Sequence, residues 1–244
     1  MLGINFYKGN IDDLCNEIIT NINNRKQFYC TTVNVDIYLL MEENLILKEI
    51  VNKSQYIVAD GMPLVWLSKI KKEPVNRITG ADLMPKLCDI AAKNYFRIFL
   101  LGGTEKVNFK AQEVIERKYG KIVAGRYSPP IGFEKDEKEL AAIINIINSC
   151  RPDIVFACLG APKQEFWISE NLHKTNASFA LTAGAGIDFI SGNMKRAPLL
   201  LQNMGLEWLY RLLMEPKRLY KRYIIRDSKF IIMAIKELFI KNAS

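Results

Sequence analysis

Short apolar segments alternate along the chain with longer segments of helical periodicity, and this alternation constrains the fold more than any other feature. The apolar segments are continuous, as expected for strands that are covered on both faces. They lie at residues 28–33, 55–59, 96–101, 122–124, 153–159 and 179–182. Helices are predicted between them, at residues 35–51, 81–93, 105–119, 136–149 and 163–172. The pattern predicts an α/β fold with a Rossmann-like, doubly wound, mainly parallel sheet.

The basic charge of the chain is concentrated at its C-terminal end. The net charge is +8, and residues 195–244 hold 11 basic and 4 acidic residues, a net charge of +7. We therefore predict two parts, an α/β domain at residues 1–194 and a basic, amphipathic, helical appendage at residues 195–244. An anionic partner, if the charge indicates one, belongs to the appendage.

Cysteine and histidine are too few and too scattered for several kinds of site. The five cysteines show no CxxC spacing, which predicts free thiols in a reducing compartment. The single histidine, His173, lies in a polar segment and is predicted to be a surface residue. We therefore expect no metal site and no histidine-based nucleophilic mechanism. No apolar run of about 18 residues predicts a spanning helix, and the N-terminus does not have the pattern of a signal peptide.

Polar residues follow the first two predicted strands, where open parallel sheets bind ligands. Thr32 and Asn34 could hydrogen-bond to sugar hydroxyls or an N-acetyl group, or Asn34 could simply cap the next helix. Asp60 is followed by Gly61, and a carboxylate there could take a proton from an attacking hydroxyl. It could equally bind a metal or cap a turn.

Glycine, lysine and glutamine mark two further strand ends. Gly102 and Gly103 lead into a helix whose first N–H groups could receive a diphosphate, although the segment is neither GxGxxG nor a Walker loop. A glycine turn with Thr104 as helix cap explains them equally well. Lys163 could bind phosphate or be a solvated surface residue, and Gln164 could bind a base or a sugar. These positions favour an enzyme that uses a nucleotide or phosphosugar, and they leave the reaction open.

Seven segments, in order along the chain, resemble the WecG/TagA/CpsF family of glycosyltransferases. They are TTVN, ADGMP, RITGADL, FLLGG, LGAPKQEFWI, GAGIDFISGNMKRAP and GLEWLYRLLMEPKRLYKRY. The resemblance implies transfer of a sugar from a UDP-sugar to an undecaprenyl-diphosphate-linked sugar at the cytoplasmic face of the membrane. The best-known transfer in the family moves N-acetylmannosamine onto N-acetylglucosamine in wall teichoic acid synthesis. It inverts the anomeric centre and is implied to need no metal or other cofactor, which fits the lack of a DxD motif.

The resemblance also implies catalytic roles. Asp60 would be the general base that deprotonates the acceptor hydroxyl, and Thr32 and Asn34 would line the sugar pocket beside it. The candidate substrate-binding residues are then Arg77, Gly102, Gly103, Lys163, Gln164, Asp188, Arg211, Arg218 and Arg222.

Among these residues, Gly102 and Gly103 would face the diphosphate, and Asp188 would contact the nucleoside. The three appendage arginines would meet a donor or acceptor diphosphate, because without a metal the departing UDP needs positive charge from the protein.

The appendage also suggests a membrane partner. Basic residues recur at helical spacing beside apolar ones, at Arg218, Lys221, Arg222, Arg226 and Lys229. This pattern predicts contact with an anionic membrane surface and a peripheral location on the inner face of the cell membrane. A homo-oligomer contact is a further interpretation of the appendage, through Leu206, Trp208, Leu209, Leu212 and Leu213. Nucleic acid is not expected, because the aromatic residues cluster on apolar surface and form no stacking platform.

Two other functional classes remain open at this point. A nucleotide-dependent oxidoreductase would use the same sheet, but the GxGxxG sequence expected after the first strand is missing. A non-catalytic scaffold at the membrane would need only the appendage.

Overall fold

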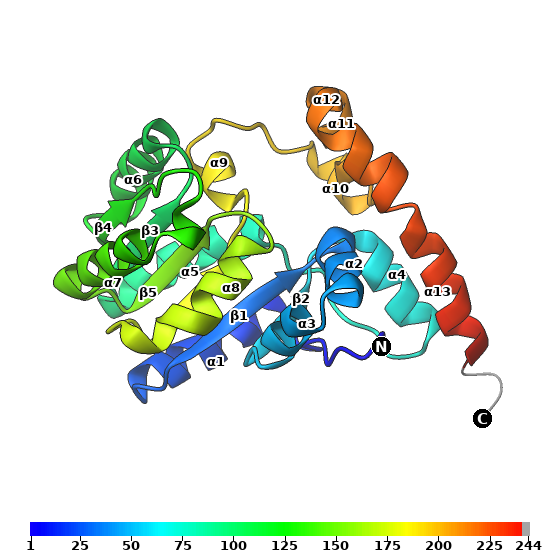
Figure 1. Ribbon diagram of the computed structural model, residues 1–244, viewed down its shortest axis with the longest axis horizontal. Helices are drawn as coiled ribbons and strands as arrows, with labels where there is room; N and C mark the ends of the chain where they lie inside the picture. The colour runs from blue at the N-terminus through cyan, green and yellow to red at the C-terminus, as the bar shows by residue number, and fades with distance from the viewer. Residues whose placement is uncertain (241–244) are drawn as a thin grey trace.

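A parallel β-sheet forms the centre of the protein in the computed structural model, which describes residues 1–240 (Figure 1). The side chains of residues 203, 218, 222, 224 and 236–240 also lie outside the described residues. The strand order is β2-β1-β6-β5-β3-β4, and every strand pair is parallel. The strands are β1 (Phe28–Val33), β2 (Tyr56–Ala59), β3 (Ile98–Gly102), β4 (Val123–Tyr127), β5 (Ile154–Cys158) and β6 (Phe179–Thr182).

Helices cover both faces of this sheet. One face carries α1 (Ile11–Asn23), α5 (Gly80–Asn94), α6 (Glu105–Tyr119) and α9 (Gly186–Ile190). The other carries α2 (Val35–Glu43), α3 (Leu45–Asn52), α4 (Met62–Ile70), α7 (Glu137–Cys150) and α8 (Lys163–Asn171), with the short 3₁₀ helices η1 (Phe133–Lys135) and η2 (Leu172–Lys174). The predicted doubly wound α/β fold is therefore confirmed.

The strands alternate their side chains between two cores. In β3, Ile98 and Leu100 join the core under α1, α5, α6 and α9, whereas Phe99 and Leu101 face α7 and α8. All four side chains are fully buried. A strand buried on both faces needs apolar residues at every position, which explains the continuous apolar segments of the sequence.

Local capping chemistry sets the helix boundaries. Thr104 caps α6 as predicted, and Asn34 caps α2 by accepting a hydrogen bond from the backbone N of Ile37 at 3.0 Å. The prediction of one helix at residues 35–51 is wrong, because Asn44 ends α2 and caps α3 through the backbone N of Leu47. Helices α1 and α4 were not predicted.

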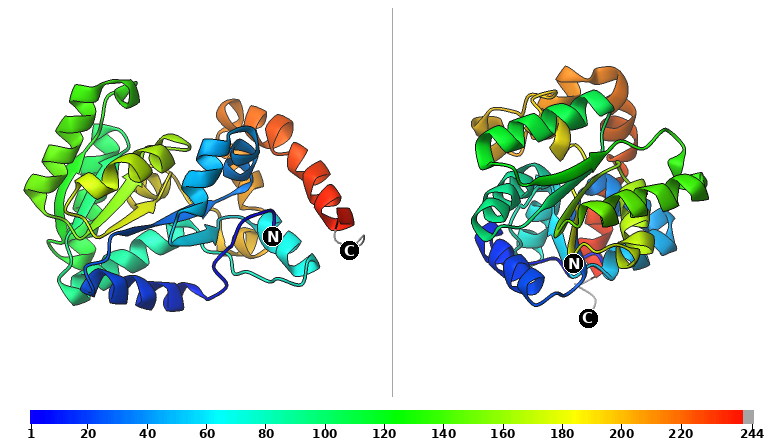
Figure 2. Two further views of the ribbon diagram at one scale, coloured as in Figure 1. Left: turned by 60° about the horizontal axis from the view of Figure 1, so that its bottom comes forward. Right: turned by 90° about the vertical axis from the view of Figure 1, so that its left-hand side faces the viewer.

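The C-terminal segment is a series of consecutive helices that lie along one side of the sheet domain, beside α2 and α4 (Figures 1 and 2). It consists of α10 (Leu199–Asn203), α11 (Glu207–Met214), α12 (Pro216–Tyr220), the π-helix η3 (Lys221–Arg226) and α13 (Lys229–Ile240). At Gly205, between α10 and α11, an added Cβ would lie 2.7 Å from the Trp66 ring, so this turn packs directly against α4. The boundary between residues 194 and 195 remains a prediction.

Part of the predicted basic face of the appendage is paired with the sheet domain. Arg226 lies 3.0 Å from the Asp36 carboxylate of α2, and Lys229 lies 3.9 Å from Glu43. Phe230 of α13 is 5% exposed and packs edge-to-face on Tyr38. The C-terminal segment is therefore docked by apolar and ionic contacts. Of its predicted basic residues, the side chains of Arg218 and Arg222 lie outside the described residues.

Two smaller expectations are also tested. The five cysteines are free, four of them buried, and His173 is exposed, as predicted. Within residues 1–240, no helix combines the length and the apolar character that a bilayer crossing needs.

Gly102 offers a test of how tightly the carboxyl ends of β3 and β5 are packed. It has φ +107°, and an added Cβ would lie 2.4 Å from the carbonyl oxygen of Cys158. Gly132 also has positive φ (+88°), but nothing lies within 4 Å of its Cβ position. We expect Gly102→Ala to lower the free energy of unfolding by about 3 kcal/mol or more, and Gly132→Ala by about 1 kcal/mol. Urea denaturation followed by circular dichroism measures both, and equal losses would contradict this account.

Candidate active site

A crevice is expected at the carboxyl edge of the sheet, between β1 and β6. The chain leaves β1 for α2 on one face, whereas it leaves the neighbouring β6 for α9 on the opposite face. Diverging connections of this kind open a space beyond the strand ends, where ligands of doubly wound sheets bind.

Asp60 is fixed at this edge by backbone hydrogen bonds. Its N–H donates to the carbonyl of Val33, the last residue of β1, at 2.7 Å. The preceding residue, Ala59, forms an isolated parallel bridge with Arg77, and its carbonyl accepts from the N–H of Ile78 at 3.0 Å. The backbone thus holds Asp60 and Arg77 beside the ends of β1 and β2.

The environment of Asp60 favours its protonated form more than water does. The pKa of Asp60 is raised to about 6, first by burial and then by the negative charge of Glu207, while Arg211 and Arg77 oppose the shift. In the part of the chain that the structure describes, no side chain hydrogen-bonds to this carboxylate. Asp60 is therefore ionised near neutral pH, and its pKa is suited to accepting a proton.

Four charged side chains form a network beside Asp60, and two of them, Arg196 and Glu207, come from residues 195–244. Arg77 donates from Nη1 to Glu207 Oε2 at 3.0 Å and lies 3.7 Å from Asp82 Oδ2. Arg196 donates from Nη1 to Asp82 Oδ1 at 2.5 Å, and its Nε lies 3.5 Å from Glu207 Oε1. The side chains are 18–33% exposed, so these are partly buried pairs rather than solvated surface contacts.

Arg211 lies one helical turn after Glu207 on α11. Its guanidinium carbon lies 5.7 Å from the centre of the Phe189 ring, over the ring. Its Nε is buried and has no hydrogen-bond partner among the described residues. Near Phe189, Asp188 accepts a hydrogen bond from Asn193 Nδ2 at 2.9 Å, so it is tied to the loop that follows α9.

Several predicted site residues make hydrogen bonds within the protein. Thr32 is buried, and its hydroxyl donates to the carbonyl of Thr182 at 2.9 Å, joining β1 to β6. Gln164 is also buried, and its Oε1 accepts from the N–H of Gly184 at 3.1 Å. Asn34 uses Oδ1 as a helix cap, and its Nδ2 group makes no hydrogen bond among the described residues.

The glycines and the lysine that are predicted to bind phosphate have partners within the protein. The N–H of Gly103 donates to the carbonyl of Cys158 at 3.2 Å, and Gly102 packs against the same backbone. Lys163 pairs with Glu134 at 2.7 Å, and both line a cavity of about 260 Å³ between η1, α7 and α8. Neither the Gly103 N–H nor the Lys163 ammonium is therefore free.

The structure therefore groups Asp60, Arg77 and Arg211, and it adds residues that the sequence analysis did not select. Asp82, Arg196 and Glu207 complete the network, and each lies within a segment that carries the family resemblance. Glu165 is a further addition. It is 1% exposed and accepts from Gln164 Nε2 at 2.9 Å, and burial raises its pKa to about 7. The spacing of these residues in the sequence shows no pattern, so only their proximity in the structure connects them with the candidate site.

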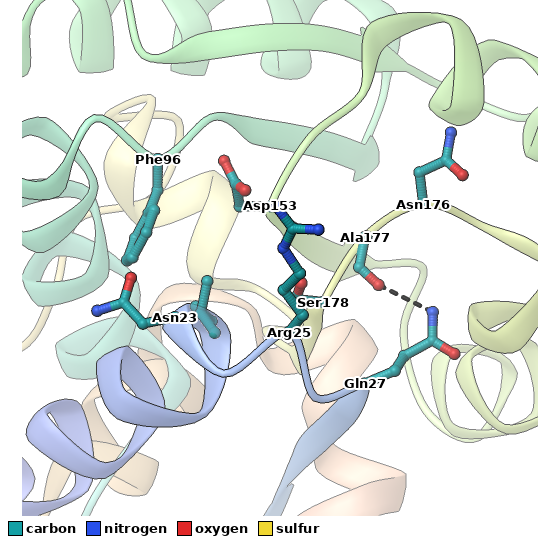
Figure 3. A pocket seen from close by; sticks show the side chains of 9 residues that line it. Asn23, Arg25, Gln27, Phe96, Asp153, Asn176, Ala177 and Ser178 are labelled. Carbon is teal, nitrogen blue, oxygen red and sulfur yellow. Dashed lines mark hydrogen bonds between the residues drawn. The ribbon is translucent and has the colours of Figure 1, made fainter.

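A second cavity, of about 450 Å³, lies at the opposite edge of the sheet (Figure 3). It is lined by residues that precede the strands, among them Arg25, Gln27 and Asp153, and Gln27 donates to the carbonyl of Ala177 at 2.9 Å. It contains none of the predicted site residues, so the carboxyl edge remains the candidate active site.

Comparison with known proteins identifies relatives over the length of the chain. Residues 1–244 match the sequence model described as "Glycosyl transferase WecG/TagA/CpsF family". Among the relatives are two proteins named N-acetylglucosaminyldiphosphoundecaprenol N-acetyl-beta-D-mannosaminyltransferase. One, from Staphylococcus aureus, is 30% identical over 222 residues, which cover 90% of this chain and 85% of the relative. The other, from Bacillus spizizenii, is 32% identical over 218 residues, covering 89% of this chain and 82% of the relative.

The raised pKa of Asp60 predicts a cost in stability. The folded protein binds the carboxyl proton of Asp60 more tightly than the unfolded chain does. The free energy of unfolding therefore falls as the pH rises from about 4 to about 6. Asp60→Asn cannot ionise, so we expect it to be more stable than the wild type at pH 7.5, by about 1–3 kcal/mol. The advantage should disappear near pH 4. Urea denaturation at both pH values measures it, and a pH-independent difference would contradict the assignment.

Proposed function

The chain belongs to the WecG/TagA/CpsF family of glycosyl transferases, and we propose that it moves N-acetylmannosamine from a UDP-sugar to undecaprenyl-diphosphate-linked N-acetylglucosamine. The names of two relatives that share most of their length with this chain support this donor sugar and acceptor. The product would enter the synthesis of teichoic acid or a related surface polysaccharide. Family membership disfavours the oxidoreductase and the scaffold.

The observation that carries the proposal is the Asp60 carboxylate, with its raised pKa, among arginines at the carboxyl edge of the sheet. In the proposed reaction the acceptor hydroxyl attacks the anomeric carbon, and Asp60 takes the hydroxyl proton. The bond from the anomeric carbon to the diphosphate oxygen breaks on the opposite side, so the configuration inverts. UDP leaves with the bonding electron pair.

Positive charge close to the departing diphosphate would stabilise it. Arg77 and Arg211 both act on Asp60 electrostatically, so they lie within reach of the same reacting centre. Guanidinium groups bind phosphate oxygens through paired, charge-assisted hydrogen bonds. We propose that these arginines take the place of a metal ion in the transfer. Arg218 and Arg222, whose side chains lie outside the described residues, would add to this charge.

The remaining predicted residues would surround the sugar and the nucleoside. Asn34 has a free Nδ2 group among the described residues, so it can donate to the N-acetyl carbonyl of the sugar while it caps α2. Thr32 and Gln164 would hold the pocket wall, because their hydrogen bonds join β1, β6 and α8. Asp188 would contact the nucleoside. Lys163, Gly102 and Gly103 could bind phosphate only by exchanging their present partners.

We further propose that the C-terminal segment rests on an anionic membrane surface, at its inner face. On α13, Ile231, Ile232 and Ile235 are 48–62% exposed, and Lys229 beside them is exposed as well. Apolar and basic side chains on one exposed helix favour the interface of anionic lipid. An enzyme with a polyprenyl-linked acceptor would meet its substrate there. A homo-oligomer contact through the same apolar residues is the competing use of this surface.

Removing the Asp60 carboxylate tests the proposed catalytic base. We expect Asp60→Asn to lower kcat by about 10²–10⁴-fold, because an amide cannot accept the hydroxyl proton. For the wild type, kcat/KM should rise with pH and level off above about pH 6, as Asp60 loses its proton. The assay supplies UDP-N-acetylmannosamine and a lipid-diphosphate N-acetylglucosamine. Asp89→Asn, which removes an exposed carboxylate paired with Lys93, is the control and should keep full activity. Normal turnover by Asp60→Asn would exclude it as the base.

The membrane proposal predicts a loss of binding from a single apolar position. Ile231→Glu should weaken binding to phosphatidylglycerol vesicles, measured by flotation, about thirtyfold, since the isoleucine side chain that the membrane would bury is worth about 2 kcal/mol. Ile131→Glu makes the same change at a fully exposed loop position and should bind like the wild type. Equal flotation of both variants, with a change of oligomeric state only in Ile231→Glu, would favour the homo-oligomer contact.

A further inference from the structure

Glu207 occupies a position between two guanidinium groups that come from different parts of the chain. Its Oε2 accepts from Arg77 at 3.0 Å, and its Oε1 lies 3.5 Å from the Nε of Arg196. Each carboxylate oxygen therefore faces a different arginine. A carboxylate held in this way stands where an anionic ligand of the two arginines would lie.

This carboxylate does not satisfy the positive groups around it. Arg211 Nε is buried and has no hydrogen-bond partner among the described residues, and the buried Arg196 Nε has only the long 3.5 Å contact with Glu207. Buried charged donors without acceptors are costly, so such groups usually mark a ligand. Glu207 contacts two guanidinium groups, those of Arg77 and Arg196, with two oxygens and one negative charge, and Arg211 lies one helical turn after it on α11. A diphosphate carries more oxygens and more charge, and it could meet all three.

The arginines are also held from the other side by Asp82, which would stay in place if Glu207 moved. Arg196 donates to Asp82 Oδ1 and to Thr79 Oγ1, and Thr79 caps α5. Burial alone would raise the pKa of Asp82, but hydrogen bonds from Arg196 and Thr79 outweigh it and lower the pKa. Asp82 is therefore a fixed anion that orients Arg77 and Arg196, whereas Glu207 belongs to the separately docked α11.

We propose that Arg77, Arg196 and Arg211 form a diphosphate-binding site, which the Glu207 carboxylate occupies until a substrate diphosphate displaces it. The inference rests on the proposed function for its ligand chemistry, a diphosphate ester that could come from the nucleotide donor or the polyprenyl acceptor. Arg196 becomes a substrate-binding residue, and Glu207 becomes an internal competitor of the substrate. The exchange keeps a negative charge near Asp60, so the base loses little of its raised pKa when the ligand arrives.

The test measures ligand binding to the full chain by calorimetry, with UDP and farnesyl diphosphate as separate probes. Glu207→Gln keeps an oxygen for Arg77 but loses the charge, so we expect about tenfold tighter binding of at least one probe. Tightening of UDP alone assigns the site to the donor, and tightening of farnesyl diphosphate alone assigns it to the acceptor. Uridine, which lacks phosphate, should bind both proteins equally.

Two further variants make the result decisive. Adding Arg196→Ala to Glu207→Gln should abolish the gain, because the freed cation is removed. Glu42→Gln removes an equal charge from the ion pair with Lys48 and should leave both affinities unchanged. Unchanged or weaker binding of both probes by Glu207→Gln, with a normal melting temperature, would show that Glu207 only ties α11 to the sheet domain. Because no turnover is required, the expected affinities without any sugar transfer would support the site and refute the proposed reaction.

Discussion

The alternating charges of Arg77, Asp82, Arg196 and Glu207 are the interaction on which the rest of the candidate site depends. They join residues separated by up to 130 positions and place the C-terminal segment against the carboxyl edge of the sheet. Breaking a partly buried pair of this kind leaves an uncompensated charge, so its members hold one another in place. Burial raises the pKa of Asp60 most, and the charges of Glu207, Arg77 and Asp82 in this network modify it further.

Around this network, hydrogen bonds within the chain fix the strand ends at the carboxyl edge of the sheet. Thr32 joins β1 to β6, Gln164 joins α8 to the loop after β6, and Asn108 donates to the carbonyls of Leu100, Gly102 and Tyr127. These contacts fix the strand ends from which the polar side chains project. Positions that are rigid before a ligand arrives need little reorganisation during the reaction, which favours catalysis by preorganised charge.

The sequence predicts the fold well, because its signals are local. Continuous apolar runs identify every strand of the sheet, and the bounds of β1, β6 and α6 are correct to the residue. The break between α2 and α3 was missed, since Asn44 caps a helix in the middle of a helical pattern. The site is harder to predict. Asp60 and Arg77 lie in segments that resemble the family, but the partners Arg196 and Glu207 meet them only through the docking of distant helices. Spacing also could not show that Lys163 pairs with Glu134, or that Arg226 pairs with Asp36.

Helix α2 links two places that are otherwise far apart in the sequence. Its first turn carries Asn34, at the proposed sugar pocket, and Asp36, which pairs with Arg226 of the C-terminal segment. Tyr38, on the same helix, packs on Phe230. One short helix therefore has the proposed sugar contact at its start and the docked segment along its side. Thermodynamic reciprocity follows. If docking of the C-terminal segment changes the binding free energy of a sugar, binding of the sugar changes the docking free energy by the same amount.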